Sequence, residues 1–423
     1  MDILHDESLN ELPPQTSSAG ALATEKLSKF LDQQRNAHLE ENFGQEKGLS
    51  RVKLATQLLS LDTTISNRSS SIPEEIPENT IGFRKIGFGQ CGLVFEWPGR
   101  EIVIKVARPG FQDALWVDYE AHKAVYSAFL AQGNVTQCRV PRVYNHISKE
   151  NRWWRENKGL FTEQHDDFPI PASALTSEHI LPLAGVIRET LVDKYCPRSM
   201  QQAALKNSLN RDCLARVYLG RRRSPHQPRQ VNFSLRNFNL CLDQMMDLGL
   251  PVSSYASAIG EALAVIHWAA NVDGYDVEFV LGSEAIVGLQ SPKTPSLHTT
   301  LEPPWTATED RRKTTRIWVL DFNLCTQWEE KTGWEQPEAL VEQLVMAFFE
   351  NDPYYPLPLM DDDLGKQLWS VFRDSYSTKA EEVLAEKDER LRALPHTFIE
   401  ACIERERQNI DNGLGHGYRQ HKG

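Results

Sequence analysis

A glycine-rich stretch followed by a lysine is the feature that most constrains the fold of this chain. Gly87, Gly89 and Gly92 form a G-x-G-x-x-G pattern, with Val94 two residues later and Lys105 near the end of the next apolar run. Glycines let backbone amides approach a polyphosphate closely and tolerate positive φ, and a nearby lysine neutralises phosphate charge. The pattern therefore predicts a nucleotide-binding β-hairpin, and the alternative is a glycine-rich hairpin turn without a ligand.

The segment around Lys105 predicts strands and one helix. Residues 93–97 and 102–106 are apolar runs on either side of the turn dipeptide Pro98-Gly99, which is typical of a hairpin. Residues 114–131 then predict a helix, on which Glu120 lies 15 residues after Lys105. A phosphate-binding lysine needs a carboxylate to hold it, and we expect Glu120 to be that partner.

Acidic residues in the second half of the chain predict a metal and acceptor site. Asp321 ends a short apolar strand and precedes Phe322, at the position of the D-F-G aspartate of kinases. Asp273 and Glu278 lie five residues apart, the spacing between the catalytic aspartate and the metal-binding asparagine of kinases. We therefore assign Asp273 as the base-like residue and Asp321 and Glu278 as ligands of Mg²⁺ or Mn²⁺. The alternative for Asp273 is turn chemistry, because Asp-Gly is a common turn pair.

The order of predicted elements indicates an α+β, bilobal protein-kinase-like fold. A strand-rich N-lobe with one helix precedes a mainly helical C-lobe that contains a short catalytic hairpin. The polar, acidic start of the chain predicts a loosely attached and partly disordered arm with two potential helices. We divide the chain into the arm and linker (1–79), the N-lobe (80–198), the C-lobe (199–410) and a tail (411–423).

Composition excludes several classes of protein. A net charge of −12 argues against nucleic-acid binding as the main function. No stretch resembles a signal peptide or approaches a membrane span of about 20 apolar residues, so we expect a cytoplasmic or nuclear protein with no membrane partner. We also expect the chain to be a monomer. The seven cysteines include no C-x-x-C pair, which favours free thiols over a zinc site.

Three segments of the sequence resemble a known family. Residues 262–268, 276–282 and 318–323 are similar to a fungal family of unknown function labelled "zinc finger protein-like", and the likeness extends over roughly residues 80–390. The cysteine spacing does not match that label. More distantly, the site resembles the superfamily of protein kinases and aminoglycoside phosphotransferases. That resemblance implies ATP and Mg²⁺ or Mn²⁺ as cofactors, held by Gly87, Gly89, Gly92, Val94, Lys105, Glu120, Asp273, Glu278 and Asp321.

Three departures from the superfamily pattern leave the function open. The H-x-D triplet reads Asn271-Val-Asp273, the metal-binding asparagine is Glu278, and Asn323 replaces the D-F-G glycine. One hypothesis is an ATP- and Mg²⁺-dependent phosphotransferase acting on a small-molecule or unusual hydroxyl acceptor. The second is an inactive pseudokinase that serves as a nucleotide-binding or protein-interaction scaffold. A third, a nuclear regulatory protein, rests on the family label alone.

Overall fold

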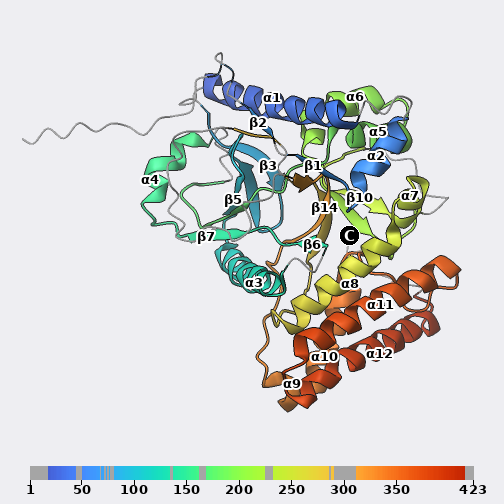
Figure 1. Cartoon of the computed structure of the whole chain (residues 1–423). Coiled ribbons are helices and arrows are strands. Elements are labelled where there is room, and N and C mark those ends of the chain that lie inside the picture. The colour runs from blue at the N-terminus through green and yellow to red at the C-terminus, as the bar shows by residue number, and fades with distance from the viewer. Residues whose placement is uncertain are drawn as a thin grey trace, which may run out of the picture.

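The computed structural model has a mixed α+β architecture, which confirms the predicted α+β class. It describes residues 18–43, 50–66, 68–70, 73, 76, 81–133, 137–161, 168–223, 232–284, 287–289 and 311–414. The predicted tail from residue 415 onward and parts of the predicted arm lie outside these ranges. Two five-stranded sheets and a group of helices make up the body of the molecule (Figure 1).

The first sheet contains the predicted glycine-rich hairpin. Its strands are antiparallel and lie in the spatial order β3 (Arg84–Phe88), β4 (Gly92–Glu96), β5 (Ile102–Ala107), β8 (Ala174–Glu178) and β7 (Val143–Ile147). Gly99 closes the β4–β5 turn with a φ of 83°, a conformation that glycine adopts readily. Helix α3 (Gln112–Ala131) packs on β7 and β8, as Figure 1 shows. An aromatic cluster with Phe83, Phe95 and Phe161 fills the sheet's core.

The second sheet brings the predicted acidic segments together. Its spatial order is β10 (Phe238–Cys241), β9 (Ala215–Tyr218), β11 (Glu278–Gly282), β14 (Arg316–Leu320) and β6 (Cys138–Arg139). Strands β11 and β14 are antiparallel, and Glu278 pairs with Leu320. Because Asp321 directly follows Leu320, this register places Glu278 and Asp321 at the same end of the hairpin.

Helices form a packed layer beside the second sheet. Helix α8 (Val252–Trp268) packs against α11 (Asp363–Leu384), and α12 (Glu389–Asp411) packs against both α10 (Pro337–Glu350) and α11 (Figure 1). Gly260 permits the close approach of α8 to α11, since a Cβ there would lie 2.5 Å from the carbonyl oxygen of Phe372. The shorter helices are α4 (Trp153–Asn157), α5 (Gly185–Tyr195), α6 (Gln201–Lys206), α7 (Leu242–Asp247) and α9 (Thr332–Glu335).

The N-terminal helices are packed on the body, so the expectation of a loosely attached arm is wrong for them. Helix α1 (Ser18–Phe43) lies along one edge of the molecule in Figure 1, and α2 (Arg51–Leu59) packs on α5. Asp32 of α1 accepts hydrogen bonds from Arg188 of α5 at 2.7 and 3.0 Å. Leu27 and Leu58 are fully or almost fully buried. These contacts join residues far apart in sequence, which a local pattern does not reveal.

Short strands complete the described structure. They pair as β1 (Thr64–Ser66) with β13 (Arg311–Lys313), and as β2 (Arg68–Ser70) with β12 (Val287–Leu289). In the stretches of chain that the structure describes, no helix combines the length and apolar character needed to cross a membrane.

Candidate functional site

Lys105 lies between two carboxylates from distant parts of the chain. Its Nζ donates to Asp118 Oδ2 and to Asp321 Oδ1, each at 2.7 Å. The Lys105 side chain is 16% exposed and that of Asp118 is 3% exposed. Burial alone would lower the pKa of Lys105, but the two carboxylates outweigh it and hold the pKa well above its usual value. The amine is therefore a fixed cation at the junction of the two sheets.

The predicted partner of Lys105 is wrong, because Asp118 and not Glu120 holds the amine. Asp118 lies on the buried face of α3 with Leu115 and Ala121, at helical spacing. Glu120 is two residues further along, about 200° around the helix, and its charge acts on His146 instead. The sequence signal that could have identified Asp118 is an acidic residue on the apolar face of the helix.

A second hydrogen bond fixes Asp118 against the D-F-N segment. Its Oδ1 accepts from the backbone N–H of Phe322 at 3.1 Å. The Phe322 ring is fully buried and lies 5.1 Å from the His122 ring of α3. Asp321 has a φ of 66°, a left-handed conformation that costs free energy in a residue other than glycine. These contacts hold the strained residue with its side chain 30% exposed, so Asp321 can reach a ligand.

The three glycines of the loop have different roles. None of them has a positive φ, so the tolerance of glycine for that conformation is not used here. A Cβ at Gly87 would lie 2.8 Å from Cβ of Val94, and one at Gly92 would lie 2.7 Å from the carbonyl oxygen of Val106. Packing therefore requires glycine at both positions. Gly89 is open, with its nearest neighbour 3.8 Å away, and leaves room for a ligand to approach the loop.

Val94 and Lys105 share one face of the first sheet. They stand directly opposite each other in the β4–β5 register, so their side chains project to the same side. Val94 also contacts Gly87 across the hairpin. The structure thus brings together the loop glycines, Val94 and Lys105, as the sequence pattern predicts.

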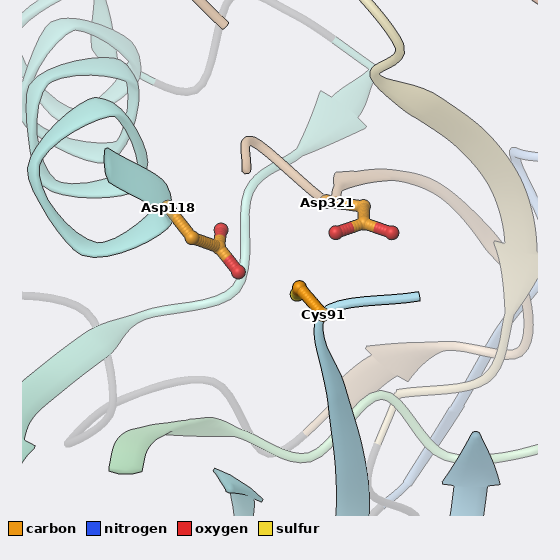
Figure 2. A group of neighbouring side chains, drawn as sticks. All are labelled: Cys91, Asp118 and Asp321. Atoms are coloured by element: carbon orange, nitrogen blue, oxygen red, sulfur yellow. The ribbon is translucent and has the colours of Figure 1, made fainter. Parts of the chain in front are cut away.

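Cys91, Asp118 and Asp321 form a compact group of possible metal ligands. Figure 2 shows their side chains converging from the glycine-rich loop, from α3 and from the segment after β14. One ligand atom of each lies within 4.8 Å of the others. Burial raises the pKa of the Cys91 thiol, which keeps the sulfur protonated. Since Mg²⁺ prefers oxygen ligands, the two carboxylates suit such a cation and the thiol does not.

Glu278 lies outside this group and is paired with an arginine that sequence reasoning missed. Arg216 of β9 contacts the Glu278 carboxylate and also donates to Asp352 at 2.9 Å. Tyr218 donates to the same Asp352 oxygen at 2.8 Å. Burial, with help from Asp321 and Asp352, raises the pKa of Glu278 to about 7, although Arg216 opposes the shift. Arg216 therefore offsets the negative charge of Glu278 when that carboxyl group is ionised.

Asp273 is buried and its carboxylate is already engaged. Oδ1 accepts from the backbone N–H groups of Tyr275 at 3.1 Å and Thr326 at 2.9 Å. Oδ2 accepts from Nε2 of Gln343 at 2.8 Å. The side chain ties its own loop to the segment after Asp321, so Asp273 has a structural role in the fold.

The charges of three acidic residues, Asp118, Asp273 and Asp321, act on one buried thiol, that of Cys325. Burial raises the pKa of the Cys325 thiol well above its usual value, and the charges of Asp273, Asp118 and Asp321 add to this shift. Asp276 contributes as well and has a left-handed φ of 62°. Helix α3, the turn at 273–276 and the segment after β14 thus each contribute a carboxylate that acts on this thiol.

Comparison with known proteins adds one match. A family model, DUF3669, described as "Zinc finger protein", matches residues 317–388. No curated protein matches the chain. The matched segment contains Asp321 and Asp352 but only one cysteine, Cys325, and no histidine. A structural zinc site needs about four Cys or His ligands, so this segment by itself cannot supply one.

Proposed function

We propose that this chain binds ATP with a divalent cation at the junction of its two sheets and transfers a phosphoryl group to a hydroxyl acceptor. The observation that carries the proposal is the placement of Lys105 between Asp118 and Asp321, beside the glycine-rich loop. Kinase sites pair a strand lysine with a helix carboxylate and place a metal-binding aspartate after a short strand. A kinase-like bilobal arrangement is part of the same proposal, supported by the strand order and the position of α3.

Each residue has a defined task in this proposal. ATP supplies the transferable γ-phosphoryl group. Lys105 neutralises phosphate charge, and Asp118 keeps its amine in place. Asp321, the more exposed of the two carboxylates, holds Mg²⁺ or Mn²⁺. Gly89 leaves the loop open for close approach. Asp273 orients the acceptor hydroxyl once Gln343 releases its Oδ2.

A second candidate function is a nucleotide-binding scaffold without catalysis. The engagement of both Asp273 oxygens favours it, because the three hydrogen bonds that they accept compete with an acceptor hydroxyl for the same carboxylate. The pairing of Glu278 with Arg216 favours it too, since the Glu278 side chain is only 17% exposed and is less open to a metal ion than Asp321, which is 30% exposed. Both functions share the nucleotide site and differ only in turnover.

Nucleotide binding is tested by thermal denaturation with ATP in the presence and absence of Mg²⁺. At 100 times Kd, ATP with Mg²⁺ should stabilise the protein by about 2.7 kcal/mol. Asp118→Asn should reduce this effect strongly, whereas Glu120→Gln on the same helix should retain it. No stabilisation of the wild-type protein by ATP at any Mg²⁺ or Mn²⁺ concentration would exclude both functions.

Turnover separates the two candidate functions. The formation of ADP is measured with water as the default acceptor and with a panel of hydroxyl compounds. ADP formation that Asp273→Asn abolishes, with ATP binding retained, supports the phosphotransferase. Tight, cation-dependent binding with no ADP formation supports the scaffold.

A further inference from the structure

A cavity lies in the helical part of the chain, and neither Lys105 nor Asp321 lines it. Its volume is about 440 Å³, and it is an open cavity lined by residues 219–222 after β9, the end of α10, residues 351–360 and the start of α11. The wall is mainly apolar and includes Leu219, Leu242, Phe349, Leu357, Met360 and Leu368. Small-molecule sites in proteins are typically concave, mostly apolar and of about 300–1,000 Å³.

Backbone contacts hold the wall of this cavity in place. The N–H of Gly220 donates to the carbonyl of Pro353 at 3.0 Å. A Cβ at Gly220 would lie 2.4 Å from the carbonyl oxygen of Tyr355, so only glycine fits between the two segments. The Tyr355 ring stacks on Phe348 with centroids 4.6 Å apart. The cavity is therefore formed before any ligand binds.

The charged side chains that line the cavity differ in whether a partner neutralises them. Arg222 is neutralised by Asp362, to which it donates two hydrogen bonds at 2.7 and 2.9 Å. Asp352 is engaged by Arg216 at 2.9 Å. The third charge on the wall belongs to Arg221, and among the described residues no ion pair or side-chain hydrogen bond engages its guanidinium. The nearby Cys241 thiol does not neutralise it, because burial raises the pKa of that thiol to about 11.

We propose that this cavity binds a small organic anion with an apolar body and one acidic group, which pairs with Arg221. The apolar wall takes the body of the ligand, and the guanidinium takes the carboxylate or sulfonate in a charge-assisted hydrogen bond. Lys105 and Asp321 do not line the cavity, so the proposal does not depend on nucleotide binding.

Fluorescence titration with two matched probes tests the proposal. 1-Anilinonaphthalene-8-sulfonate has the required apolar body and anion, and N-phenyl-1-naphthylamine has the same body without the charge. The wild-type protein should bind the sulfonate saturably at one site and bind the neutral probe more weakly. Arg221→Met should weaken sulfonate binding by about tenfold and leave the neutral probe unchanged, because only the charged contact is lost.

Two further variants test whether the probes bind in this cavity. Met360→Trp should fill the cavity and weaken the binding of both probes. Arg155→Met removes an exposed arginine of α4 and should change neither. Equal sulfonate affinity in wild type and Arg221→Met, or full binding in Met360→Trp, overturns the proposal.

Hydrogen exchange of the wild-type protein gives a test that needs no variant to fold. The sulfonate probe should slow amide exchange in residues 219–222 and 353–360. Protection confined to other parts of the chain, or no saturable binding at all, also overturns the proposal.

Discussion

Replacing Lys105 with methionine removes the cation at the centre of the site and keeps an unbranched side chain. Asp118 and Asp321, which each bind Nζ at 2.7 Å, are then left without a positive partner. Asp118 is 3% exposed and retains only the N–H of Phe322 as a described donor. Removing one partner of a buried ion pair costs about 3–5 kcal/mol. Because Asp321 is 30% exposed and partly solvated, we expect a loss of about 3 kcal/mol.

A divalent cation should restore part of this lost stability. Ligand atoms of Cys91, Asp118 and Asp321 lie within 4.8 Å of one another, and the variant frees both carboxylates to bind a metal. Mn²⁺ or Mg²⁺ at 100 times Kd would contribute about 2.7 kcal/mol. The wild-type protein, in which Nζ holds both carboxylates, should gain less from the cation alone.

Urea unfolding followed by tryptophan fluorescence measures both effects at neutral pH. Lys123→Met, which removes an exposed lysine from α3, is the matched control and should change stability by less than about 0.5 kcal/mol. The reasoning fails if the Lys105 variant is as stable as the wild type. It also fails if the cation stabilises both proteins equally.

Three other changes test the loop, the N-terminal helix and a buried histidine. Gly92→Ala should destabilise the protein by about 1–3 kcal/mol through a clash with Val106. Gly89→Ala should leave the melting temperature almost unchanged and weaken only ATP binding. Equal melting temperatures of the two variants would contradict the packing argument. Asp32→Asn should lower the free energy of unfolding in urea by about 3–5 kcal/mol, because it leaves two buried arginines without their carboxylate. A decrease below about 1 kcal/mol would mean that this contact does not hold α1. Burial lowers the pKa of His179 to about 4, so the native state binds fewer protons than the unfolded state and stability falls as pH drops below about 6.5. His179→Gln should remove about 2 kcal/mol of the loss between about pH 7 and pH 5, and an unchanged pH profile would contradict this assignment.

Local patterns determined the elements that carry the site. The β4–β5 hairpin follows from two apolar runs on either side of Pro98-Gly99, and α3 follows from helical spacing after Gly110. The strand before Asp321 is a short apolar run. Turn chemistry and the periods of strand and helix act over a few residues, so they can be derived from a single sequence. Sequence reasoning also placed Lys105 and Asp321 in one site, through the resemblance to the kinase pattern and not through local structure.

Contacts between distant residues were decided only by the tertiary structure. Asp118 and Glu120 are both acidic residues of one helix, and only the packing of α3 on the first sheet selects Asp118 as the partner of Lys105. Arg216 reaches Glu278 because β9 and β11 are neighbours in the second sheet. The attachment of α1 likewise depends on Arg188, which lies 156 residues after Asp32. Such pairings depend on which faces become buried together, and a buried charge is stable only beside the partner that the whole fold supplies.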